Sequence, residues 1–187
     1  MLQPAQTRWL SLICVVKRIL EQYEALKLYF QAESSDGIES ANEILNNLLN
    51  STTKLYLEIL EYTLPIFIDL NLEFQAESPR IHLTYDHVKS AYLSVLKCYL
   101  KPQYVDNTDV SAIQYRNPSN FKPLENIHCG PKVAVALQRK LLSKDEEKQL
   151  KVKCLDFYVE CAHQIYSRFP FNSEQIKSIS PCKLVID

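Results

Sequence analysis

Apolar residues recur every three or four positions along most of this chain, which is the spacing of one face of an α-helix. Polar runs separate the stretches that show this pattern, the clearest being Glu33 to Gly37. The pattern predicts six helices and a short seventh, over residues 9–30, 38–49, 52–78, 85–100, 131–142, 144–168 and 174–180.

Residues at the ends of these stretches agree with the helical interpretation. Thr7 is placed to cap the first helix, and Pro131 suits the first turn of the fifth. Ser143 and Glu146 have the spacing of a capping box before the sixth helix. Pro65 lies inside the third stripe, where it removes a backbone donor, so we expect a kink near residues 61–64.

The segment 101–127 shows no sustained period and contains three prolines. A structureless loop of that length is uncommon in a compact domain. We therefore expect it to wrap the surface, held there by Tyr104, Tyr115 and Phe121. The pattern as a whole predicts an all-α fold, an irregular bundle of six to seven helices with one long loop, forming a single domain over residues 1–187.

Composition narrows the function classes. The chain has 187 residues, of which 47% are hydrophobic and 23% charged, but only two glycines. Glycine-rich phosphate loops and dinucleotide-binding fingerprints need more glycines than that, and so do the tight turns of all-β folds. No apolar run approaches a membrane span, and the N-terminus does not look like a secretory signal. We expect a nuclear or cytoplasmic protein with no cofactor and no small-molecule substrate.

Charge is distributed unevenly along the chain, although the net charge is only −1. Residues 31–80 carry nine acidic side chains against Lys54 and Arg80, whereas residues 131–187 carry ten basic and seven acidic ones. A strong DNA-binding domain has a decisive basic face, because phosphate attraction supplies most non-specific affinity. Any DNA binding by this chain is therefore expected to be weak.

Other residues of the types found in metal and catalytic sites are interpreted as structural. The grouping nearest to a metal site is Cys154, Cys161 and His163, which we interpret as small core residues and a surface histidine rather than a zinc site. His82 and His87 flank a helix start and are expected to lie at the surface or to cap the helix. An acidic row on the third helix is expected to be its solvated face: Glu58, Glu61, Asp69 and Glu73. Several tyrosines are expected at the core edge with hydroxyls in water: Tyr23, Tyr56, Tyr92 and Tyr158.

A series of short motifs gives the chain a family resemblance. They occur in this order: Gln6-Thr7-Arg8-Trp9-Leu10-Ser11-Leu12, Arg18-Ile19-Leu20-Glu21-Gln22, Leu26-Lys27-Leu28-Tyr29-Phe30, Leu64-Pro65, Glu73-Phe74-Gln75-Ala76-Glu77-Ser78-Pro79 with Ile81-His82, Leu100-Lys101-Pro102 and Arg168-Phe169-Pro170-Phe171. This ordered set resembles the hAT superfamily of DNA transposases, and within it the animal relatives of the BED-finger and zinc-finger MYM-type groups. The resemblance spans nearly the whole chain.

The resemblance implies a specific place for the Arg-Trp pair. In hAT transposases a large helical insertion interrupts an RNase H-like catalytic core, and its tryptophan stacks on a base flipped out of the DNA. By that match Trp9 is the stacking residue and Arg8 a candidate phosphate contact, with Lys17 and Arg18 as further candidates for binding nucleic acid. Base stacking contributes roughly 1–3 kcal/mol, enough to offset part of the cost of extrusion.

The family's catalytic acids and dimerisation region have no counterpart in this sequence. We therefore expect a non-catalytic insertion-domain fragment, with neither catalytic nor metal-binding residues, that retains weak DNA binding. Two alternatives stay open, namely a helical module that binds a protein partner or associates with itself, and a mobile-element remnant with no selected function. For Trp9, the alternative to base stacking is a core aromatic that anchors the first helix.

Overall fold

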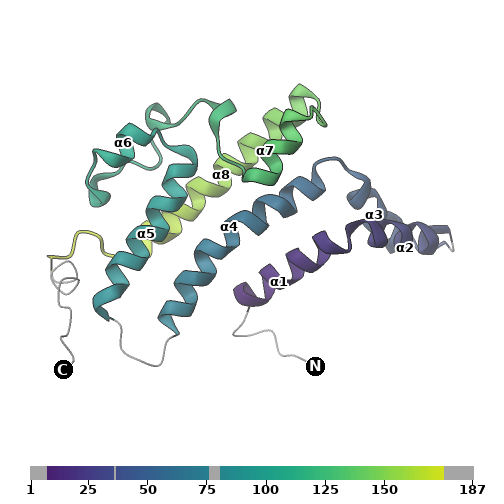
Figure 1. Ribbon diagram of the computed structural model, residues 1–187, viewed down its shortest axis with the longest axis horizontal. Coiled ribbons are helices and arrows are strands. Elements are labelled where there is room, and N and C mark those ends of the chain that lie inside the picture. The colour runs from purple at the N-terminus through teal and green to yellow at the C-terminus, as the bar shows by residue number, and fades with distance from the viewer. Residues whose placement is uncertain (1–7, 36, 76–80, 175–187) are drawn as a thin grey trace. The chain divides into compact units, whose positions relative to one another are not determined.

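The computed structural model describes residues 8–35, 37–75 and 81–174, and the side chains of residues 8–10, 73, 81 and 82 lie outside that description. The described residues form an all-α fold, as the sequence predicts, with no β-strand among them beyond an isolated bridge between Leu100 and Phe121. The described residues contain eight α-helices, labelled in Figure 1: α1 (Arg8–Glu21), α2 (Tyr23–Ser35), α3 (Glu39–Leu49), α4 (Thr53–Phe74), α5 (Ile81–Tyr99), α6 (Pro102–Asp106), α7 (Pro131–Gln138) and α8 (Lys144–Arg168).

The chain divides into two compact units. Unit 1 consists of Met1–Pro65 and Cys129–Leu150, and unit 2 of Ile66–His128 and Lys151–Asp187. Helices α4 and α8 each contribute residues to both units. The two units are therefore described one at a time.

In unit 1 the long helix predicted over residues 9–30 is two helices, because Gln22 separates α1 from α2. The separation is slight. The Gln22 N–H still donates to the carbonyl of Arg18 at 3.1 Å, and the Leu26 N–H donates to the carbonyl of Gln22 at 2.8 Å. No proline or glycine stands at this point, so the sequence gives no signal for the break.

Helices α2 and α3 pack side by side as a hairpin within unit 1 (Figure 1). Gly37 lies in the turn between them with φ +83°, a conformation that residues with a Cβ rarely adopt. Tyr23, Ala41 and Leu48 are buried, which is consistent with an apolar seam along the hairpin. The hairpin confirms the break predicted at residues 33–37 and the predicted second helix, although α2 continues to Ser35.

Helix α4 continues through Pro65 instead of ending there. Pro65 has no N–H to donate to the carbonyl four residues earlier, and the kink expected from this loss stays a prediction. In the same unit, Gly130 precedes α7 with φ +92°. A Cβ built on Gly130 would lie 3.0 Å from the Cβ and Cγ of Tyr62, so both backbone conformation and space require glycine there.

The start of α8 matches the sequence prediction, whereas the end of α7 does not. The Ser143 backbone N–H donates to the Glu146 carboxylate at 2.9 Å, and the Glu146 N–H donates to the Ser143 hydroxyl oxygen at 3.2 Å. This reciprocal pair is the predicted capping box. Helix α7 ends at Gln138, four residues earlier than predicted, because the chain turns through Lys140 at φ +54°.

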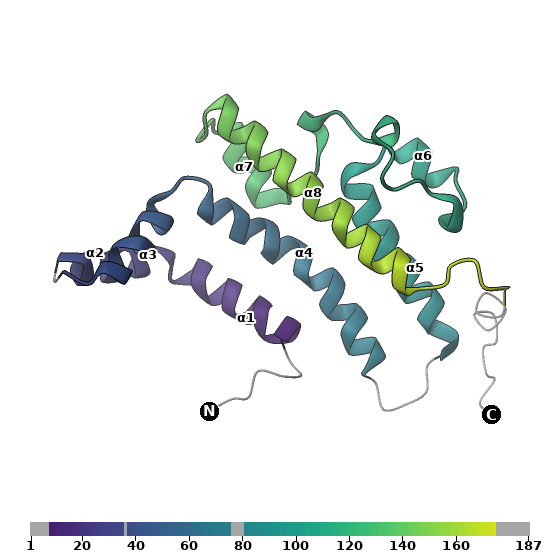
Figure 2. The same ribbon diagram turned by 180° about the vertical axis from the view of Figure 1, so that it is seen from behind.

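Unit 2 is built around aromatic side chains between α5 and the C-terminal part of α8, which lie next to each other in both views (Figure 2). The rings of Tyr92 and Phe171 stack with centroids 5.0 Å apart, and Tyr166 lies 6.0 Å from Tyr92. Tyr92 and Tyr99 are completely buried. Phe171 follows the predicted end of α8 at Arg168 and fills this core.

The segment 101–127, which the sequence predicts to be one long loop, contains short helical elements. It contains α6 and three 3-10 turns, at Val110–Ala112, Pro118–Asn120 and Leu124–Asn126. The structure confirms that the aromatic side chains hold it. The Tyr104 hydroxyl accepts the N–H of Gln114 at 2.8 Å, and the ring of Phe121 contacts Tyr99 edge-on at 5.4 Å.

Side chains from the neighbouring helices satisfy backbone carbonyls of this segment. Tyr99 donates to the carbonyl of Tyr115 at 2.8 Å, and Tyr166 donates to that of Ser111 at 2.8 Å. Lys151 donates to the carbonyl of Glu125 at 2.9 Å. Irregular backbone can lie against a core only when its polar groups have partners, and these donors from α5 and α8 supply them.

Candidate functional site

The four residues predicted to bind nucleic acid all lie in α1. Lys17 and Arg18 are exposed, and Arg18 approaches Glu21 at 3.8 Å on the same helix. Such an exposed pair contributes little energy, so the Arg18 guanidinium can exchange Glu21 for a phosphate. The predictions for Arg8 and Trp9 concern side chains outside the described ones, although the backbone of both is helical.

The helix does not bring the four candidates onto one face. Successive residues of an α-helix are about 100° apart, so Lys17 and Arg18 project in different directions. Position 9 lies four and seven residues before Ile13 and Val16, which are both buried. Ile13 and Val16 mark the packed side of α1. Arg18 lies about 160° around the helix from Val16, on the opposite side, whereas Lys17 lies only about 40° from Ile13, at the edge of the packed side.

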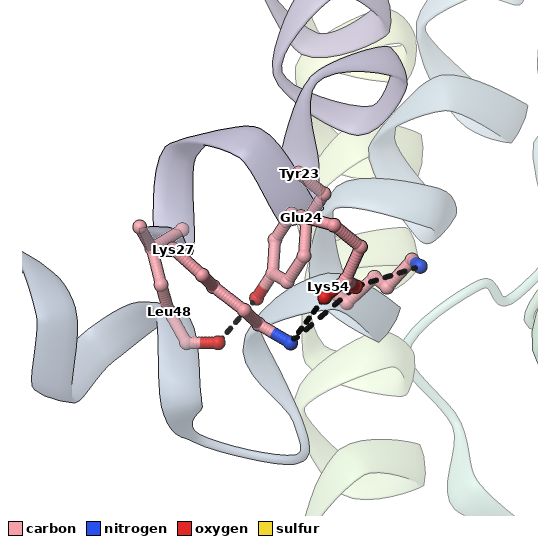
Figure 3. A network of polar contacts seen from close by, with 5 residues as sticks. All are labelled: Tyr23, Glu24, Lys27, Leu48 and Lys54. Carbon is pink, nitrogen blue, oxygen red and sulfur yellow. Dashed lines mark hydrogen bonds and ion pairs between the residues drawn. The ribbon is translucent and has the colours of Figure 1, made fainter. Parts of the chain in front are cut away.

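A network of charged and aromatic groups joins α2 to α3 and α4 (Figure 3). The buried Tyr23 donates its hydroxyl hydrogen bond to the carbonyl of Leu48 at 2.9 Å. The ammonium groups of Lys27 and Lys54 lie 5.0 and 5.2 Å from the Tyr23 ring centroid, on either side of the Glu24 carboxylate that both approach. The arrangement clamps the hairpin to the start of α4 through cation–π contacts.

Burial raises the pKa of the Tyr23 hydroxyl, and the neighbouring Glu24 carboxylate raises it further. The phenol therefore stays protonated and keeps donating to Leu48 across the physiological pH range. The expectation that Tyr23 holds its hydroxyl in water is wrong. Tyr158, which is also buried, likewise donates to a carbonyl, that of His128 at 2.8 Å.

The acidic row on α4 is partly an ion-paired surface instead of a fully solvated one. Glu61 is only 21% exposed and its carboxylate meets the Lys132 ammonium at 2.6 Å. Burial raises the pKa of the Glu58 carboxyl, while Lys54 and Lys132 lower it. Asp69 is exposed as expected, and the prediction for the Glu73 side chain lies outside the described residues.

The described residues contain no group of three side chains arranged to hold a metal ion. Cys154 is buried, and burial raises the pKa of the Cys161 thiol to about 12. His163 Nδ1 lies 2.9 Å from the Tyr115 hydroxyl, so that ring nitrogen is already engaged within the fold. His87 is exposed, as expected, whereas the side chain of His82 lies outside the described residues.

Tyr92 is the exception among the buried tyrosines. Its hydroxyl is enclosed and, among the side-chain atoms that the structure describes, has no hydrogen-bond partner. Burial raises the pKa of Tyr92 far above its ordinary value. The sequence gives no sign that Tyr99 and Tyr158 hold backbone carbonyls whereas Tyr92 does not, because all three look alike in a helical stripe.

No family model matches the sequence, and neither a curated protein nor a solved structure matches it. None of the helices in the described part of the chain is long and apolar enough to cross a membrane.

Proposed function

We propose that this chain is a non-catalytic helical module derived from the insertion region of an hAT-type transposase, and that it binds DNA weakly through α1. The observation that supports it most is the ordered series of hAT-like motifs in a chain that folds as helices throughout its described part. The Arg8-Trp9 motif begins α1, and exposed Lys17 and Arg18 follow two to three turns later.

The four candidate residues divide between base stacking and phosphate contact in this proposal. Trp9 stacks on an unpaired base, an interaction worth roughly 1–3 kcal/mol, and Arg8 contacts a flanking phosphate. Lys17 and Arg18 extend the phosphate contact along the helix, about 15 Å from Arg8 at the far end because an α-helix rises 1.5 Å per residue. With a net charge of −1, the rest of the chain adds little attraction. Binding is therefore weak and strongly dependent on salt.

The geometry around α4 supports a role without phosphoryl-transfer chemistry. Two-metal catalysis requires clustered carboxylates that are free to hold the ions. On α4, Glu61 is neutralised by Lys132, and Asp69 is an exposed carboxylate two helical turns further along. In this proposal α1 holds DNA and carries out no chemistry on it.

Binding of labelled single-stranded and hairpin DNA, measured by anisotropy between about 50 and 200 mM salt, tests the proposal. The unmodified chain should bind at low salt and release on addition of salt. Trp9→Ala should weaken binding to both DNAs, and Lys17→Glu with Arg18→Glu should also flatten the salt dependence.

Lys148→Glu is the matched control, because Lys148 is an exposed lysine of the same unit on a different helix. It should change affinity much less than the α1 substitutions. Absence of binding at low salt contradicts the proposal. So does an equal loss for the α1 and Lys148 variants, because it would indicate attraction by overall charge alone.

A further inference from the structure

Three lysines lie where the end of α5 meets the segment 101–127: Lys97, Lys101 and Lys122. The isolated antiparallel bridge between Leu100 and Phe121 joins the two parts of the chain at this point. Lys101 and Lys122 directly follow the two bridge residues, and Lys97 lies one turn earlier on α5. All three lysines belong to unit 2, and we call them the lysine cluster.

Backbone carbonyls hold two ammonium groups of the lysine cluster in place. The Lys101 ammonium donates to the carbonyl of Ser119 at 2.7 Å, and the Lys122 ammonium donates to that of Lys97 at 2.6 Å. An ammonium group has three N–H donors, so each of these two keeps donors for a further acceptor. Fixing a long side chain costs conformational freedom, and the fold has already fixed these two before any ligand binds. The cluster is therefore pre-organised for an anion.

Positive charge exceeds negative charge in this part of the chain. Residues 87–124 carry five basic and two acidic side chains. One of the two acids, Asp106, approaches the Lys97 ammonium at 3.1 Å, and both side chains are more than half exposed. Such an exposed pair is weak and can exchange for another anion. Within the described part of the chain, neither Lys101 nor Lys122 forms an ion pair with a carboxylate.

The other acidic residues close in sequence do not neutralise the cluster. Burial, and then the nearby Asp109 carboxylate, raise the pKa of the Tyr85 hydroxyl, which places Asp109 toward the beginning of α5. Glu125 follows Lys122 by three residues, but the Lys151 ammonium donates to its backbone carbonyl at 2.9 Å and adds a positive charge there. The end of α5 therefore keeps an excess of positive charge.

The surface around the lysine cluster offers no apolar anchor for a protein or a bilayer. Among the described residues between Phe74 and Val135, no large apolar side chain is exposed. Tight protein contacts and peripheral membrane contacts both depend on such side chains. Exposed polar side chains of the segment are instead of the kinds that contact phosphate and sugar: Gln103, Gln114, Ser119 and Asn126. This composition favours a nucleic-acid backbone as the anion.

We propose that the lysine cluster is a second nucleic-acid contact of this protein, which binds phosphates of the sugar–phosphate backbone irrespective of base sequence. It lies in unit 2, and it does not rest on the contact proposed for α1 in unit 1. The net charge of −1 does not oppose it. At about 0.1 M salt, charges more than about 10 Å apart are largely screened, so the local charges decide the contact.

Anisotropy of labelled hairpin DNA with the full chain, over the same salt series, tests the lysine cluster. Lys101→Gln with Lys122→Gln should weaken binding at least about ten-fold at the lowest salt. The slope of log affinity against log salt should fall by about two, because two phosphate contacts are lost. Lys101→Arg with Lys122→Arg should bind like the unmodified chain, since arginine also donates to phosphate.

A matched control removes the same charge from the other end of α5 in the same unit. Lys89→Gln with Arg168→Gln serves this purpose. The Lys89 ammonium lies 5.9 Å from the Tyr85 ring centroid, and the ring of Phe169, next to Arg168, lies 6.1 Å from it. This control should change the affinity much less than the glutamine variant of the cluster. Far-UV circular dichroism checks that each variant is folded.

Four results would overturn the proposal. The glutamine variant of the cluster could bind as tightly as the unmodified chain, or lose no more affinity than the control. The arginine variant could lose binding as well, which would mean that the lysines act on the fold alone. A glutamate-rich peptide or phosphatidylserine vesicles could bind through Lys101 and Lys122 more tightly than DNA, which would assign the cluster to a protein or a membrane.

Trp9→Ala distinguishes this proposal from that for α1. If Trp9→Ala binds hairpin DNA normally while the glutamine variant of the cluster does not, the contact at α1 is wrong and the lysine cluster stands. If Trp9→Ala weakens binding and the glutamine variant does not, the lysine cluster is wrong and α1 stands.

Discussion

The segment 101–127 and helix α2 combine backbone regularity and side-chain packing in opposite ways. The segment has little regular structure, yet side chains of Tyr99, Tyr166 and Lys151 hold its carbonyls. Helix α2 is regular, yet leaves a full apolar stripe in water: Ala25, Leu28, Tyr29 and Ala32. Backbone regularity and completeness of packing are therefore separate properties. The irregular segment is part of a packed core, whereas the regular helix keeps apolar side chains exposed to solvent.

The largest loss of stability should come from truncating Tyr99, which contacts the segment 101–127. Tyr99→Ala removes a completely buried ring, its edge contact with Phe121 and its hydrogen bond to Tyr115. We expect the free energy of unfolding to fall by about 3–5 kcal/mol. Urea denaturation followed by circular dichroism measures this. A loss below about 1 kcal/mol would show that the segment is not held through Tyr99.

Substitution by phenylalanine, which removes only the hydroxyl, should change stability differently at Tyr99 and Tyr92, which are equally buried. Tyr99→Phe leaves the part-buried carbonyl of Tyr115 without this donor and should cost about 1–3 kcal/mol. Tyr92→Phe removes a buried hydroxyl that has no partner among the described side-chain groups, so it should be neutral or slightly stabilising. Matched denaturation curves test the pair. Equal losses would contradict the distinction between them.

A smaller effect on stability, which depends on pH, is expected from Glu146, whose carboxylate accepts hydrogen bonds from Ser143 and Ser51 in unit 1. The Ser143 N–H, the Ser143 hydroxyl and the Ser51 hydroxyl lower the pKa of Glu146 below its ordinary value of 4.5. A lowered pKa contributes stability that is present above pH 4.5 and is lost as the pH falls through the folded value. Glu146→Gln should remove this acid-dependent part. Thermal melts from pH 6 downward that shift in parallel for both proteins would contradict it.

The smallest effect on folding should follow substitution of the exposed stripe. Leu28→Gln should change the free energy of unfolding by no more than about 0.5 kcal/mol, because the side chain is 69% exposed. The same denaturation experiment used for Tyr99 measures it. If the free energy of unfolding fell as much as it does when a core residue is truncated, Leu28 would have to be packed. The contrast between α2 and the segment 101–127 would then be wrong.

Much of the fold follows from the sequence because helical periodicity and capping are local signals. The period of the apolar residues locates α3, α5 and α8, and the Ser143–Glu146 spacing locates the start of α8. The break at Gln22 has no local signal, and neither does the early end of α7. Turns within 101–127 depend on donors that come from helices distant in sequence, which a local pattern cannot reveal.

The candidate site was less predictable than the fold. A stripe of apolar residues reveals that a helix is amphipathic but not which of two apolar faces is covered, so the exposure of Leu28 and Tyr29 appears only in the structure. Lys17 and Arg18 are exposed, and their predicted role in DNA binding stays a prediction. The predicted roles of Arg8 and Trp9 rest on the family resemblance and stay predictions.

Trp9 is the single tryptophan of the chain, so intrinsic tryptophan fluorescence reports on the proposed DNA contact without background. Titration with hairpin DNA should quench this emission over the same concentrations at which the anisotropy of labelled DNA rises, because a base stacks on the indole. Added salt should reverse both signals together. Emission that stays unchanged while DNA binds, or DNA that does not bind at all at low salt, would contradict the proposed role of α1.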